Sequence, residues 1–156
     1  MLKKKSTLIV LVIAVVILGL ALYPNIWKGG SDTENQQTNH SVPCLLPNLS
    51  LIQHIHATLI ITVDGEPEAV PANIGLSQTC ERAVHTHETD GVIHVEAQDN
   101  RRYVFADFLD VWGKDSNRPG YELETLVDGK PFAGDLAELE LENEQIIELH
   151  YAALEE

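Results

Sequence analysis

Five of the seven histidines in this 156-residue chain fall into two short clusters. The first cluster is His54-Ile55-His56, and the second joins His85-Thr86-His87 to His94. Residues two apart on a β-strand point to the same face, so each His-x-His pair places two imidazoles about 6 to 7 Å apart at the backbone. Neutral imidazole is a preferred ligand of Zn(II) and Cu(II), so this spacing predicts a metal site.

The even spacing of residues across the second predicted hairpin adds a third imidazole to the same face. If Glu88 to Gly91 form the loop, His85 lies opposite His94, whereas a two-residue turn at Asp90-Gly91 pairs His87 with His94. In both registers the three imidazoles share one face and fill three of four tetrahedral positions. The predicted metal ligands are His85, His87 and His94, with His54 and His56 either completing the ligand set or forming a second site.

Two carboxylates accompany the second cluster. Glu96 falls on the same face as His94 by alternation, and it has three candidate roles: orienting an imidazole, binding the ion, or acting as a general base. Glu88 is the other candidate for a catalytic role, with solvation in the loop as its alternative. Asp90 is simply a turn residue before Gly91.

The two cysteines precede the two predicted histidine strands. Cys44 and Cys80 are expected to form a disulfide, which closes a loop of 36 residues and brings those strands together. The alternative is Cys80 as a copper thiolate beside His85 in a blue-copper site. Such sites usually add an axial Met, and the only methionine is Met1.

The elements that must position these side chains begin with a clear strand. His54 to Val63 alternate, with Ile55, Ala57, Leu59, Ile61 and Val63 on one face and the histidines on the other. This pattern predicts a half-buried strand that turns at Asp64-Gly65 into Glu66 to Val70.

Other segments predict a mostly β domain of the α+β kind. In Phe105 to Trp112 apolar residues follow helical spacing, and Gly113 ends that helix. Asp128-Gly129 marks another hairpin turn. The fold expected is a small antiparallel β-sandwich or partly open barrel with one or two short helices. Further strands are predicted at Ala83 to His87, Val92 to Glu96, Arg101 to Val104, Tyr121 to Val127 and Gln145 to Tyr151.

The N-terminus differs in kind from the rest of the chain. An apolar run from Thr7 to Tyr23 follows three lysines at positions 3–5. This pattern predicts one transmembrane helix with a cytoplasmic N-terminus. A cleaved signal peptide is the alternative. The remainder then lies outside the cytoplasm, in the periplasm or the extracellular space. The domains expected are an anchor at 1–28, a flexible polar linker at 29–41 and a histidine-rich β domain at 42–156.

The net charge excludes one class of partner. Lys and Arg number 10 and Asp and Glu number 24, for a formal charge of −14. Such a surface repels phosphate backbones, so nucleic acid is not an expected partner.

Several motifs together resemble a known family. They are His54-Ile55-His56, the segment HTHETDGVIHVE at 85–96 and the segment FADFLDVWG at 105–113. They resemble a family of exported bacterial and archaeal domains of unassigned activity, with HTHDTxGxIHxE and F-x-DVWG signatures. The resemblance covers roughly Gln53 to Tyr151, and Glu88 stands where that family typically has Asp. It implies an exported domain with a recurring histidine set, and it supplies no substrate.

These observations predict a membrane-anchored, extracytoplasmic protein that binds Cu(II) or Zn(II) for metal acquisition, buffering or delivery. One alternative is a metal-dependent hydrolase or hydratase with a three-His site, in which Glu88 or Glu96 takes a proton from water. The other is an accessory subunit of a membrane complex, in which the histidines are incidental. A fully ligated site of four or five histidines favours binding, and an open coordination position in a concave pocket favours catalysis.

Overall fold

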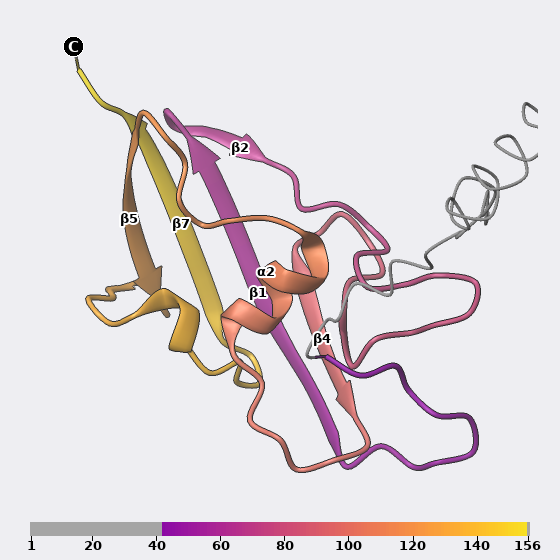
Figure 1. Ribbon diagram of the computed structural model, residues 1–156. Helices are drawn as coiled ribbons and strands as arrows, with labels where there is room; N and C mark the ends of the chain where they lie inside the picture. The colour runs from indigo at the N-terminus through magenta and orange to yellow at the C-terminus, as the bar shows by residue number, and fades with distance from the viewer. Residues whose placement is uncertain (1–41, 156) are drawn as a thin grey trace, which may run out of the picture. The chain divides into compact units, whose positions relative to one another are not determined.

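A single sheet of seven strands forms the framework of the computed structural model, which describes residues 42–155. The strand order is β3-β4-β1-β7-β5-β6, and β2 pairs with the end of β1 (Figure 1). The strands are β1 (Gln53–Val63), β2 (Glu66–Glu68), β3 (Val84–His85), β4 (Val92–Ala97), β5 (Tyr121–Val127), β6 (Lys130–Pro131) and β7 (Ile146–Ala153).

Two of the Asp-Gly pairs form tight hairpin turns in the sheet. Asp64-Gly65 joins β1 to β2, and Asp128-Gly129 joins β5 to β6. All four residues have positive φ, as a tight two-residue turn between antiparallel strands requires. The alternation of β1 is also confirmed, because Ala57, Leu59 and Ile61 are buried while the intervening side chains are more exposed.

The prediction of a mostly β domain is confirmed, and its finer form needs correction. A sandwich has two facing sheets, whereas the described residues form one. The sheet is also not purely antiparallel, because β1 and β7 run parallel, with Thr58 opposite Ile146. The segment Arg101 to Val104 is not a strand: Val104 makes only an isolated bridge to Glu140.

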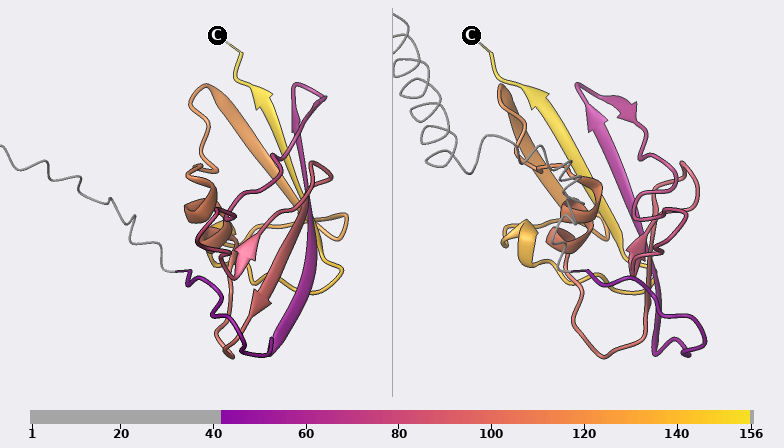
Figure 2. Two further views of the ribbon diagram at one scale, coloured as in Figure 1. Left: turned by 90° about the vertical axis from the view of Figure 1, so that its right-hand side faces the viewer. Right: turned by 45° about the vertical axis from the view of Figure 1, so that its right-hand side comes forward.

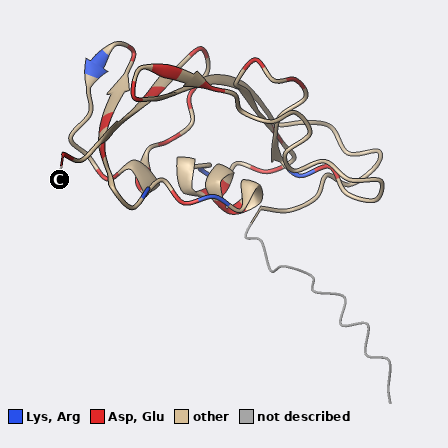
Figure 3. Ribbon diagram, turned by 90° about the horizontal axis from the view of Figure 1, so that it is seen from above, with Lys and Arg blue, Asp and Glu red and all other residues tan. Residues whose placement is uncertain are grey.

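One α-helix, α2 (Phe105–Trp112), covers one face of the sheet. Figures 1 and 2 show it lying across the sheet, and Figure 3 shows sheet and helix as two layers. Phe105 and Phe108 are fully buried among the apolar side chains of the sheet. Asp107 stabilises the start of the helix, since its carboxylate accepts a hydrogen bond from the backbone N–H of Val104, the residue before the first turn, at 3.0 Å. Gly113 ends it in the left-handed conformation, as predicted.

The described part of the chain also contains one 3₁₀ helix, η1 (Leu136–Glu138), which the sequence did not predict. Among residues 42–155, no helix has the length and apolar character needed to cross a bilayer. The predicted anchor at 1–28 and the linker at 29–41 lie outside the described residues.

The predicted disulfide is present and joins the start of the domain to the segment before β3. Cys44 and Cys80 are bonded, with their Cα atoms 5.3 Å apart. Beside this bond, the backbone of Cys44 forms a bridge with Arg82, and the Leu45 N–H donates to the Glu81 carbonyl at 2.7 Å. The segment that leads into β3 is therefore held on both sides before it reaches the histidines.

Candidate functional site

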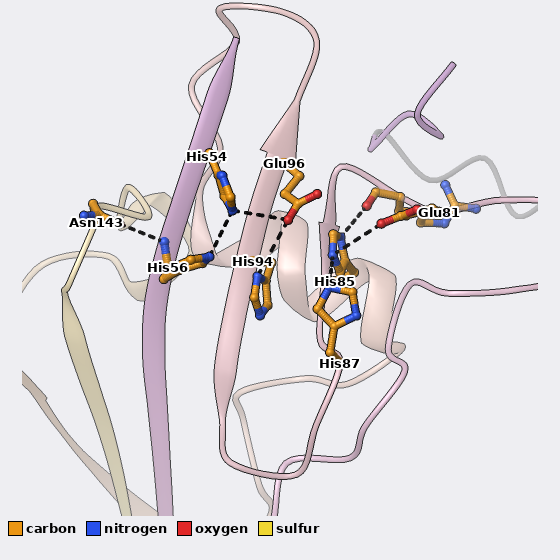
Figure 4. Close-up of polar contacts among 9 residues, drawn as sticks. His54, His56, Glu81, His85, His87, His94, Glu96 and Asn143 are labelled. Atoms are coloured by element: carbon orange, nitrogen blue, oxygen red, sulfur yellow. Dashed lines mark hydrogen bonds and ion pairs between the residues drawn. The ribbon is translucent and has the colours of Figure 1, made fainter. Parts of the chain in front are cut away.

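The strand register brings the two histidine clusters together. Strand β4 lies between β3 and β1, and His94 on β4 is directly opposite His56 on one side and His85 on the other. In the next row, His54 of β1 is opposite Glu96 of β4. Because these positions alternate with buried apolar ones, they occupy the sheet face away from the core (Figure 4). Of the two registers that the sequence allowed, the structure has the one that pairs His85 with His94.

His85 is fully buried and held in one tautomer. Its Nδ1 lies 2.8 Å from the carbonyl oxygen of Arg82, and a carbonyl can only accept, so Nδ1 carries the proton and donates it. In the neutral ring Nε2 is then bare and points to Nε2 of His87 at 3.1 Å. Burial lowers the pKa of His85, which keeps the ring neutral and its Nε2 lone pair free for a metal ion.

His85 owes its burial to the segment before β3. The Thr86 N–H donates to the Ile74 carbonyl at 3.0 Å, which ties the end of β3 to that segment. Gly75 has a φ of 77°, and an added Cβ would lie 3.1 Å from the His85 Cβ and 2.6 Å from the Val84 carbonyl oxygen. A glycine there lets the backbone lie directly against His85.

His94 occupies the centre of the cluster, and one of its nitrogens lacks a partner. Among the described residues, its Nδ1 is the one buried side-chain nitrogen or oxygen atom without a hydrogen bond. Burial, followed by the neighbouring His56, His87 and His85, lowers its pKa to about 4. A buried polar atom without a partner is costly, and a bound cation would satisfy it.

His54 and His56 form a second pair on the exposed side of His94. Their Nε2 atoms lie 3.2 Å apart, and the His56 ring centroid lies 4.6 Å from that of His94. The turn before β7 supports this part of β1: Asn143 accepts a hydrogen bond from the His56 N–H at 3.0 Å, and the Glu144 N–H donates to the His56 carbonyl at 2.7 Å.

The carboxylates differ in how close they come to the imidazoles. Glu96 Oε1 lies 3.3 Å from His54 Nε2 and 3.9 Å from His94 Nδ1, so one oxygen faces both strands. Glu81 Oε1 lies 3.7 Å from His85 Nε2. Glu88 is exposed in the loop between β3 and β4 and belongs to neither group of potential ligands. Asp90 accepts a hydrogen bond from the Val92 N–H, as a turn residue does.

Two groups of side chains therefore present ligand atoms at metal-binding distances. In each group the ligand atoms lie within 4.8 Å of one another; the groups are His85, His87, His94 and Glu96, and His54, His56 and His94. Two nitrogens bound to one tetrahedral Zn(II) are about 3.3 Å apart, given bonds of about 2.0 to 2.1 Å. The observed separations of 3.1 and 3.2 Å within the two pairs fit this requirement.

The disulfide settles the role of Cys80. Its sulfur is bonded to Cys44, so the described residues offer no thiolate for a blue-copper site. His150, the remaining histidine of the described part, lies apart from the cluster and forms a 2.7 Å hydrogen bond with Thr62 Oγ1.

Sequence reasoning missed two supporting groups. The carbonyl of Arg82 fixes His85, and a backbone carbonyl carries no signal in the residue type. Glu81 stands four residues before His85, a spacing that carries little weight outside a helix. The shared position of His94 follows from the order β3-β4-β1, which local patterns do not reveal.

Comparisons with protein-family models, with curated proteins and with solved structures return no match to this chain. The functional argument therefore depends on the geometry of the cluster.

Proposed function

We propose that this chain is an extracytoplasmic, membrane-anchored protein that binds Cu(II) or Zn(II) through His85, His87 and His94. The observation that carries this proposal is the buried Nδ1 of His94, which has no partner and belongs to a ring flanked by His56 of β1 and His85 of β3. Neutral imidazoles suit both metals, and the lowered pKa values of His85 and His94 keep their lone pairs free at neutral pH.

The donor count supports binding over catalysis. A catalytic zinc has three protein ligands and keeps a fourth position open for water. Here Glu96 stands within reach of the three imidazoles as a fourth donor, so the tetrahedron is complete without water. Metal acquisition, buffering or delivery is therefore favoured over a hydrolase or hydratase.

Three features support the location outside the cytoplasm. The disulfide suits an oxidising compartment. The apolar run behind three lysines suits a membrane anchor whose following domain is exported. The formal charge of −14 raises the local concentration of cations near the domain.

The metal content of the purified chain tests this proposal. The full chain is purified in detergent without a histidine tag, supplied with Cu(II) or Zn(II), desalted and analysed for metal. We expect about one ion per chain in the wild type and strong depletion in His85→Ala and His94→Ala, since each loses an imidazole ligand.

His150→Ala is the matched control, because it removes a histidine outside the cluster and should leave the metal content unchanged. The proposal fails if the wild type retains no metal, or if His94→Ala retains as much as the wild type.

A further inference from the structure

The two groups of potential ligands are not independent, because both contain His94. We propose that His54 and His56 form a loading site, and that a captured ion passes by way of His94 to an inner site made by His85, His87 and Glu96. This inference rests on the proposed function and adds a direction of transfer to it. One ion per chain is taken up at the exposed pair and retained at the pair that contains the buried His85.

The shared ligand limits the cluster to one ion at a time. The His94 ring centroid lies 4.6 Å from that of His56 on one side and 4.6 Å from that of His87 on the other. A neutral imidazole has one bare nitrogen and therefore binds one ion. Two ions would share His94 only if it lost its remaining ring proton and became an imidazolate.

Exposure gives the two sites different roles. The His54 side chain is 57% exposed, whereas the His94 side chain is 18% exposed and that of His85 is fully buried. His87 is exposed as well, but its partner His85 is not, so His54 and His56 form the pair in which both imidazoles are open to solvent. An ion arriving from solvent is therefore held by two ligands there first. Because exposed imidazoles are mobile and well hydrated, they exchange ligands readily.

Donor count and preorganisation favour the inner site at equilibrium. It offers four donors against three in the outer group. His85 is already held in the metal-binding tautomer by the Arg82 carbonyl, so binding costs little reorientation. The inner site therefore holds the ion more tightly than the loading site.

The transfer is a ligand exchange with no change in oxidation state. Bonds from the ion to the Nε2 atoms of His54 and His56 break as bonds to those of His85 and His87 form, while the bond to His94 persists. The Nε2 proton that neutral His87 donates to His85 in the empty site moves to Nδ1 of His87 by way of solvent, so that His87 binds the ion as a neutral imidazole. Glu96 Oε1 faces both His54 and His94, so it can contact the ion before and after the exchange.

Stopped-flow loading of the full chain with one equivalent of Cu(II), followed by the copper d–d absorption, tests the direction of transfer. The double variant His54→Ala/His56→Ala should still retain about one ion, with an affinity within about threefold of wild type. Its loading should slow by about tenfold or more, because the pair with both imidazoles exposed is gone and only His87 still faces the solvent.

The reciprocal variant His85→Ala/His87→Ala should load at the wild-type rate and lose its copper to EDTA at least about tenfold faster. His150→Ala should match the wild type in both measurements. The pair His54→Asn/His56→Asn repeats the outer test with polar side chains of similar bulk, and near-ultraviolet circular dichroism checks the fold of each variant.

Three results would overturn the inference. Uptake of two copper ions with magnetically coupled electron paramagnetic resonance signals would indicate an imidazolate-bridged pair. Wild-type loading rates in the outer variant would remove His54 and His56 from the path, and complete loss of binding in that variant would place the retained ion there. Failure of the proposed function is distinguishable, because then the wild type and both double variants hold no copper.

Discussion

His94 illustrates how burial keeps an imidazole neutral. Its pKa is lowered from 6.5 to about 4, first by desolvation and then by the neighbouring His56, His87 and His85, while Glu96 opposes the shift. The charged form is thus disfavoured in the folded chain. The same residue that binds a cation well when neutral must therefore weaken the metal-free fold in acid.

The sign of this effect gives a prediction for the metal-free chain. Between pH 6.5 and about 4 the unfolded chain binds a proton at His94 and the folded chain does not, so stability falls as the pH falls through this window. We expect His94 to account for a loss of roughly 2 to 4 kcal/mol between pH 7 and pH 4. Urea unfolding with EDTA present, at several pH values, measures it.

His94→Gln provides the comparison, because it keeps a polar side chain that does not titrate. Its stability should fall less between pH 7 and pH 4 than that of the wild type. Equal losses in the two proteins would mean that other groups, and not His94, carry the acid sensitivity.

Glu96 and Glu88 were both candidates for a functional carboxylate, and the structure separates them. Glu96 faces His54 and His94, whereas Glu88 lies outside both ligand groups. Glu96→Gln should weaken metal binding by about 10- to 100-fold, because it removes an anionic donor while keeping the side-chain length. Competition with a chromophoric chelator measures the affinity. Glu88→Gln is the matched control, and an equal effect in both variants would contradict the assignment.

Much of the cluster was predictable from the sequence at this scale, and some was not. The period of two in β1 placed His54 and His56 on one face, and the alternation of the second cluster placed His85 and His94 on one face. The pairing of β4 with β1, which brings the two clusters together, carries no local signal. His87 lies past the end of β3, so strand parity does not position it. Its approach to His85 depends on the backbone of the loop, which residue types do not specify.

At the scale of elements, one tight contact fixes the β3–β4 hairpin against β1. Gly91 has a φ of 80°, its carbonyl accepts a hydrogen bond from the Leu59 N–H at 2.8 Å, and an added Cβ would lie 2.2 Å from the Leu59 carbonyl oxygen. Only glycine permits this approach. The register that sets His94 opposite His56 depends on it.

Gly91→Ala should therefore lower the free energy of unfolding by more than about 2 kcal/mol and weaken metal binding with it, because β1 and β4 must separate. Chemical denaturation and chelator competition measure the two effects. Gly65→Ala is the control: Gly65 also has positive φ, at 85°, but an added Cβ meets no atom within 4 Å. If both variants lose the same stability, the contact with Leu59 is unimportant.

Local patterns predicted some elements well and the sheet order poorly. The bounds of α2 and β5 match the predicted segments, since periodicity and the adjacent glycines mark them. The two-residue strand β6 is too short for a pattern. The parallel pairing of β1 with β7 joins segments far apart in sequence, so hairpin signals alone led to the wrong expectation of an antiparallel sandwich.

At the scale of the whole domain, the two faces of the sheet differ in the side chains that they carry. One face packs against α2 and forms the apolar core, and the other carries the histidine cluster. The disulfide lies next to the segment that leads from Cys80 through Arg82 to His85. We therefore expect folding stability and the shape of the histidine cluster to depend on the same covalent bond.

Replacing both cysteines by serine tests this link. The loop spans 36 residues, so Cys44→Ser/Cys80→Ser should lower the free energy of unfolding by about 3 to 4 kcal/mol. Metal affinity should also fall, because the Arg82 carbonyl is less firmly held against His85. Denaturation and chelator competition on wild type and variant measure both. Unchanged affinity in the folded variant would show that the site is independent of the disulfide.

X-ray absorption at the zinc edge, on the full chain loaded with one equivalent of Zn(II), tests the central claim most directly. It counts imidazole ligands around the ion, whatever the function of the protein. We predict three imidazole nitrogens at about 2.0 to 2.1 Å and one oxygen at a similar distance, as expected for His85, His87, His94 and Glu96. A shell of oxygen atoms without imidazole scattering would contradict the account, because the ion would then lie away from the histidine cluster.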